Sequence, residues 1–123
     1  MLAAFLFTAL LLLLATFQIA LIAGAPLGRF AWGGQHEVLP ARLRRGSVLA
    51  ILIYAGMALI VLDRAGAISI FPAGASAVLV WVVFAYSCLS VVLNAISRSK
   101  PERYLMVPVS LALAVLSLLV ALS

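Results

Sequence analysis

The chain has 123 residues, of which 67% are hydrophobic, and it carries a formal net charge of +5 at neutral pH. A soluble domain this apolar could not cover its surface with polar groups, so the composition excludes an ordinary soluble domain. The charged side chains gather in short clusters between long apolar stretches, which is the pattern of a membrane protein and not of a nucleic-acid-binding one.

Four apolar stretches are long enough to cross a bilayer. Backbone polar groups within hydrocarbon must bond internally, so such spans are helices or strands of a closed barrel. Barrel strands alternate apolar and polar residues over about ten positions, whereas these stretches are continuously apolar. We therefore expect an all-α fold, a polytopic membrane protein formed by a single four-helix transmembrane bundle. The expected spans are residues 2–23, 47–62, 75–97 and 104–122.

The first span is rich in leucine and carries an amide, Gln18, near its end. The connection that follows, residues 24–46, is long for a small bundle, and such loops are often functional. Trp32 suits the level of the lipid headgroups. His36, beside Glu37, is the only side chain that titrates near neutral pH when unperturbed.

Trp32, His36 and Glu37 therefore form a candidate loop site. In the functional interpretation, His36 is an acid/base group or a headgroup contact, and the segment 32–38 folds back onto the bundle. In the alternative interpretation, the loop is a solvated connector, and His36 points into water.

The second span is the shortest, at about 25 Å, and ends at the adjacent charges Asp63 and Arg64. The next loop, residues 65–74, is itself apolar, so we expect it to lie in the membrane interface on the outer side.

The third span carries the clearest pattern, a stripe of small polar residues. They follow one another at i, i+3, i+7 and i+10, which places them within about 80° on one helix face. The members are Ser87, Ser90, Asn94 and Ser97. Polar groups at membrane depth face protein or water, so the stripe is either a packing seam or one wall of a polar cavity.

Gln18 and Asn94 lie at similar depth, near the same end of the bundle, if the helices run antiparallel. An unmatched amide in hydrocarbon costs several kcal/mol. We therefore expect both amides to point into the interior, close enough to bond directly or through water, with Ser90 nearby.

The fourth span follows a short basic loop, residues 98–103. Ser99 is placed to cap the helix, and Pro101 suits its first turn. Glu102 offsets part of the local positive charge.

Lys and Arg are distributed asymmetrically among the loops. Seven of the eight lie in residues 24–46 and 98–103, and both termini lack them. The positive-inside rule then predicts that these two loops are cytoplasmic and both termini are outside, in a cell inner membrane. Six of the cations are also candidates for contact with anionic lipid headgroups. They are Arg42, Arg44, Arg45, Arg98, Lys100 and Arg103.

Motifs for enzymatic chemistry are absent. The sequence has no Gly-rich phosphate loop, no nucleophile elbow and no paired Cys or His at metal-binding spacing. No acidic residue lies within the interior of a span. We therefore expect no metal and no cofactor, and an enzyme acting on a membrane substrate is the weaker alternative, resting on His36 and Glu37 alone.

Four spans in about 120 residues resemble the small multidrug resistance transporters in size and helix count. Those transporters have an acidic residue in their first helix, where this chain has only Gln18, so the resemblance does not extend to proton-coupled export. The chain also looks like the small, uncharacterised four-helix inner-membrane proteins of bacteria.

Two functions from different classes remain. The first is a non-catalytic membrane protein that binds lipid, or a partner in a larger membrane complex, through its basic cytoplasmic loops. The second is a small transporter or permease, acting as a homo-oligomer, with a polar path along the third helix. A cavity at Asn94 favours the second function, and a closed bundle favours the first.

Overall fold

The computed structural model describes residues 1–123 and consists of helices and loops without strands. Four long helices make up the bundle. They are α1 (Leu2–Ile22), α2 (Ala41–Ala65), α3 (Ala75–Ala95) and α4 (Lys100–Leu122). Each is long and apolar enough to cross a membrane, so the chain is an all-α, multi-pass membrane protein.

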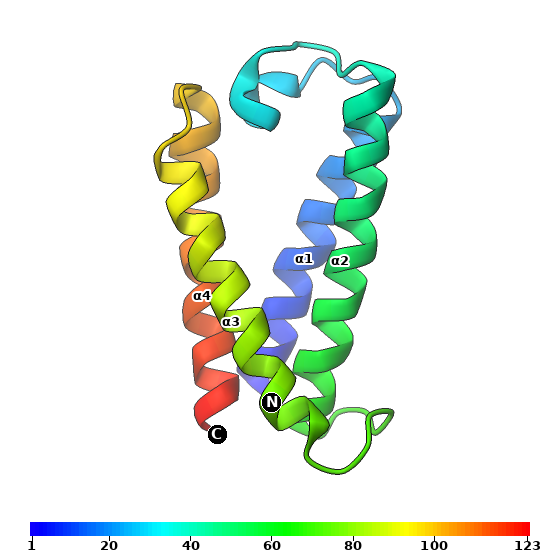
Figure 1. Cartoon of the computed structure of the whole chain (residues 1–123), viewed down its shortest axis with the longest axis vertical. Helices are drawn as coiled ribbons and strands as arrows, with labels where there is room; N and C mark the ends of the chain where they lie inside the picture. The colour runs from blue at the N-terminus through cyan, green and yellow to red at the C-terminus, as the bar shows by residue number, and fades with distance from the viewer.

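The helices run up and down and form two pairs. α1 packs mostly against α2, and α3 packs mostly against α4. Figure 1 shows that the two pairs lie close together at the end that carries both termini and separate toward the opposite end. The long first loop bridges the separated end, where the short loop between α3 and α4 also lies. Both basic loops are therefore on one side of the bundle, with both termini on the other.

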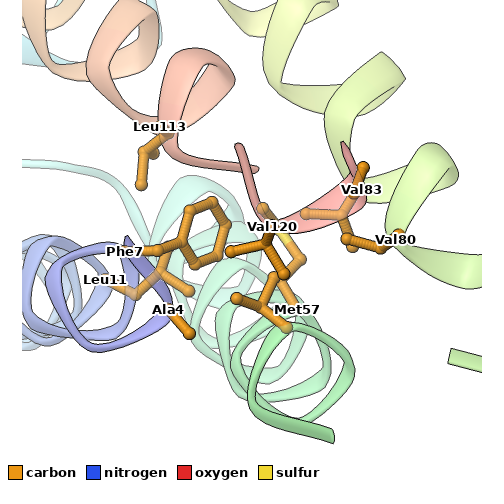
Figure 2. Packing of buried hydrophobic residues seen from close by; sticks show 10 residues of the cluster. Ala4, Phe7, Leu11, Met57, Val80, Val83, Leu113 and Val120 are labelled. Carbon is orange, nitrogen blue, oxygen red and sulfur yellow. The ribbon is translucent and has the colours of Figure 1, made fainter. Parts of the chain in front are cut away.

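The hydrophobic core lies at the closed end of the bundle. Phe7 is completely buried there, among side chains from all four helices (Figure 2). The core comprises Ala4, Phe7, Leu11, Met57, Val61, Val80, Val83, Leu113, Val120 and Ala121. The core includes a small residue from each of α1 and α4, Ala4 and Ala121, and small residues are common where helices pack in membranes.

The helix ends differ from the predicted spans by two residues or more at four places. α2 ends at Ala65, three residues after the predicted end, and therefore includes Asp63 and Arg64. α2 begins at Ala41, six residues before the predicted start, and its 25 residues reach about 37 Å. Its basic first turns are too polar for hydrocarbon but form good helix at the membrane surface. α3 ends at Ala95, so Ser97 lies beyond the helix and not on its polar face. α4 begins at Lys100 and so includes part of the predicted third loop.

The start of α4 has the predicted cap. The Ser99 hydroxyl accepts a hydrogen bond from the backbone N–H of Glu102 at 3.3 Å, and Pro101 lies in the first turn.

At the other end of the bundle, the Asp63 carboxylate accepts hydrogen bonds from the backbone N–H groups of Ile70 and Phe71 at 2.8 and 3.0 Å. This carboxylate therefore orders the loop between α2 and α3.

The core predicts a large difference between two phenylalanines on α1. We expect Phe7→Ala to lower the free energy of unfolding by about 1–3 kcal/mol through lost packing. The loss is smaller than in a water-soluble core, because lipid is as apolar as the protein interior. Phe5 is 52% exposed, so Phe5→Ala serves as the matched control and changes stability little. Reversible unfolding in mixed micelles measures both, and equal losses would contradict the placement of the core.

Candidate functional site

A cavity of about 250 Å³ lies between the two helix pairs, on the side of the bundle where they separate. All four helices and the first loop contribute to its lining. Met57 and Leu113, which also belong to the core, form its floor. Its lining includes polar side chains from each helix, namely Gln18, Tyr54, Tyr86, Ser87, Ser90, Asn94, Glu102 and Ser110.

Gln18 projects into the cavity from the last turns of α1 and is only 9% exposed. Its Nε2 donates a hydrogen bond to the Tyr54 hydroxyl on α2 at 3.3 Å. Its Oε1 is buried and has no hydrogen-bond partner. A buried acceptor without a partner is costly, so this atom marks a place for a hydrogen-bond donor.

Asn94 enters the cavity from the last turn of α3. Its Nδ2 donates to the Ser110 hydroxyl on α4 at 3.3 Å. Gln18 and Asn94 were expected to bond directly or through water, and no direct bond joins them, although both line the cavity together with Ser90. The physical reason is the separation of the helix pairs at this depth, which leaves each amide to bond within its own pair.

The polar stripe of α3 lines the cavity and also contributes to the packing of α3 against α4. Ser87, Ser90 and Asn94 line the cavity, and Asn94 also joins α3 to α4. The hydroxyls of Ser87 and Ser90 donate to the carbonyls one turn earlier, at 2.9 and 3.0 Å. Ser97 is not part of this wall, because its hydroxyl accepts a hydrogen bond from the backbone N–H of Ser99 beyond the helix end.

The first loop folds back over the cavity. Phe30, Ala31 and Trp32 contribute to the lining, within two short 3₁₀ turns at Gly28–Phe30 and Trp32–Gly34. Trp32 has a φ of 53°, a conformation that is rare for a bulky side chain.

Contacts with α2 hold Trp32 in this conformation. Its indole N–H donates to the Ser47 hydroxyl at 3.4 Å. Its ring lies so close to Gly46 that a Cβ there would be 2.9 Å from a ring carbon. A side chain at position 46 would therefore force the Trp32 ring to shift from its place against α2.

Two residues at the start of α4 hold the other side of the loop. Glu102, which is 8% exposed, accepts a hydrogen bond from the backbone N–H of Gly33 at 3.3 Å. The Ser99 hydroxyl donates to the carbonyl of Arg29. Gly34 has a φ of +71°, and a Cβ there would be 2.5 Å from the Cβ of Ser99. Only glycine combines this conformation with this approach.

Sequence reasoning missed several residues of the site, namely Tyr54, Tyr86, Ser110 and Glu102. Glu102 was interpreted only as a local charge offset. The available signal was its spacing from Ser99, because Ser-x-x-Glu is a capping box in which the Glu side chain accepts from the cap residue's N–H. Here the N–H of Ser99 bonds to Ser97 instead, and the Glu102 carboxylate bonds to the loop at Gly33.

His36 and Glu37 take no part in the cavity. Neither contributes to its lining, and Glu37 is exposed. The carbonyl of Glu37 accepts a hydrogen bond from the backbone N–H of Gly28 at 2.8 Å, which shapes the loop. Of the three candidate loop residues, the structure brings only Trp32 to the site.

The basic residues lie around the same end of the bundle, outside the cavity. Arg42, Arg45, Arg98 and Lys100 are exposed. Two others are partly held by the protein. Arg44 donates from Nε to the carbonyl of Leu39 at 2.7 Å. Arg103 donates from Nη1 to the carbonyl of Ser97 at 3.4 Å and lies 5.4 Å from the ring centre of Tyr104.

The hydrogen bonds predict how the amides couple. Asn94→Leu and Ser110→Ala should show a coupling of about 0.6–2 kcal/mol in a double-mutant cycle, because they remove the two halves of one bond. Gln18→Leu and Asn94→Leu should be additive within about 0.5 kcal/mol, because they act in different helix pairs. Unfolding in mixed micelles measures both cycles, and strong coupling in the second would show that the two amides bond to each other.

Comparisons of the chain with protein-family models, with curated proteins and with solved structures found no match.

Proposed function

We propose that the chain is a small permease whose solute occupies the cavity between the two helix pairs. The single observation that carries this proposal is the unpartnered Oε1 of Gln18, buried in a cavity that all four helices line. An amide oxygen at membrane depth needs a donor, and no protein group supplies one. Water or a solute within the cavity meets this need.

The shape of the bundle supports a path with one closed end. The cavity extends from the first loop to about the middle of the bundle, since Ser87 lies eight residues, or roughly 12 Å, before the end of α3. Below it the apolar core blocks passage toward the termini. Movement of one helix pair against the other is the motion that would open this core, because the pairs meet mainly there.

One chain lines the whole cavity. A homo-oligomer is therefore compatible with the proposal but is not needed to complete the site.

Lipid binding by the basic loops is a second candidate function. The observation that favours it is the ring of exposed cations at the loop end, together with a shallow hollow beside Arg103. That hollow also includes Tyr104 and Pro108 on the outer surface of α4. Each exposed cation near an anionic leaflet contributes about 1 kcal/mol, so these residues would fix the bundle in the membrane.

We propose the topology that the charge asymmetry predicts, with the loop end cytoplasmic in an inner membrane. In a Cys88→Ser background, Ser69→Cys should react with a membrane-impermeant thiol reagent on intact cells, and Gln35→Cys should react only after lysis. Both positions are exposed, so accessibility within the protein does not limit the reaction. Labelling of Gln35→Cys on intact cells would reverse the topology.

The proposed path predicts that a hydrophilic reagent reaches membrane depth at the cavity. In the same background, Ser90→Cys and Asn94→Cys should react with a charged methanethiosulfonate applied from the loop side of membrane vesicles. Leu89→Cys is the matched control, since Leu89 adjoins Ser90 but is 53% exposed on the surface of the helix that faces lipid. Lipid excludes the charged reagent, so this control should not react. Equal protection of all three cysteines would contradict a hydrated cavity.

A further inference from the structure

We propose that the cavity binds a primary ammonium group, with Glu102 as its counter-ion. This inference rests on the proposed function and names the chemistry of its solute. It is carried by the charge of the lining, by the hydrogen-bonding state of the polar groups and by the side chains around them.

The cavity lining contains an acidic side chain but no basic one. Glu102 is the one acidic residue of the lining, and no Lys, Arg or His contributes to it. The carboxylate is nine-tenths buried and accepts a hydrogen bond from Gly33, which leaves further lone pairs free. Its place in the first turn of α4 stabilises a negative charge there. The cavity therefore holds an anion without a paired cation.

Several of the other polar groups of the cavity offer free acceptors. Gln18 Oε1 has no donor. The hydroxyls of Ser87 and Ser90 donate to carbonyls of their own helices, so the lone pairs of their oxygens remain for other donors. The Ser110 hydroxyl also donates to its own helix, and its oxygen already accepts a hydrogen bond from Asn94. An ammonium group has three donors and no acceptor, and it is the common functional group that fits such a set.

Aromatic residues complete the lining. Phe30, Trp32, Tyr54 and Tyr86 all contribute to it. Aromatic rings attract cations through their faces, most strongly when water is excluded. The free volume of about 250 Å³ is below the range of about 300–1,000 Å³ for pockets that hold drug-sized ligands. It suits a small amine, or the headgroup of a lipid without its acyl chains.

Two sources can supply this chemistry, a soluble amine or the ethanolamine headgroup of a phospholipid. The experiment uses the whole protein in phosphatidylcholine nanodiscs, which contain no primary amine. Titration calorimetry, with empty nanodiscs subtracted, compares 2-phenylethylamine with 2-phenylethanol and with trimethyl(2-phenylethyl)ammonium. We expect the primary amine to bind at least about tenfold more tightly than the alcohol, because only the amine pairs with the carboxylate. We expect the quaternary ion to bind less tightly than the amine, because it has no N–H to donate to Gln18.

Two variants locate the charge. Glu102→Gln should reduce the affinity for the amine to that for the alcohol. Glu37→Gln is the matched control, since it removes one negative charge from the same end of the bundle at an exposed residue outside the cavity. It should leave the preference for the amine unchanged. If Glu102→Gln does not fold, as judged by circular dichroism, Gln18→Leu replaces it and should weaken amine binding several-fold.

The lipid arm of the experiment repeats the amine titration in nanodiscs that contain phosphatidylethanolamine. Competition by this lipid would identify its headgroup as the natural ligand. If the lipid does not compete with the amine, the ligand is a soluble amine.

Equal binding of amine and alcohol, or binding of the quaternary ion as tight as that of the amine, would overturn the ammonium inference. Absence of any amine binding would also overturn it. The labelling of Ser90→Cys and Asn94→Cys tests the hydrated path independently of amine binding. Failure of the ammonium inference can therefore be distinguished from failure of the proposed function.

Discussion

Hydrogen bonding of amides at membrane depth is the constraint on which the rest of this bundle depends. Gln18 bonds to Tyr54 within the first helix pair, and Asn94 bonds to Ser110 within the second. No side-chain hydrogen bond crosses from one pair to the other beside the cavity. At the end with the termini, the pairs are held together by apolar packing, and Arg64 on α2 donates a hydrogen bond to the Ser123 carbonyl at the end of α4. Polar bonds thus join the helices within each pair at the loop end, while the pairs meet mainly through the apolar core at the opposite end.

This division of forces explains why a cavity can exist in so small a protein. Between membrane helices there is no hydrophobic driving force, because lipid solvates apolar side chains as well as protein does. Helices therefore stay together only where they pack closely or form hydrogen bonds. At the loop end the pairs do neither with each other, and the polar groups that face the resulting space depend on the first loop to cover them.

The sequence predicted the fold well, because transmembrane hydropathy is a strong and local signal. It failed at the start of α2, where Arg42, Arg44 and Arg45 lower the hydropathy without ending the helix. The periodicity of α3 placed Ser87, Ser90 and Asn94 on one helix face, because a helix face follows from spacing alone, and all three line the cavity.

The partners of these residues could not be predicted in the same way. Tyr54 and Ser110 meet the two amides through the packing of one helix on another, which no local pattern encodes. The position of the first loop over the cavity was not predicted, for a similar reason. The left-handed Trp32 contacts Ser47, 15 residues along the chain, and the bond from Gly33 to Glu102 joins residues that are 69 positions apart. His36 stands out in the sequence because of its chemistry, but the sequence does not indicate its position, which is outside the cavity.

The attachments of the first loop have a mechanical consequence. Trp32 fastens the loop to α2 through Ser47, whereas Ser99 and Glu102 fasten it to α4. The loop therefore spans the gap between the two helix pairs, which pack against each other at the opposite end of the bundle. A change in the angle between the helix pairs therefore alters the conformation of this loop before it disturbs the hydrogen bonds within either pair. These few hydrogen bonds thus limit how far the two helix pairs can separate, and they also hold the loop in place over Gln18 and Asn94.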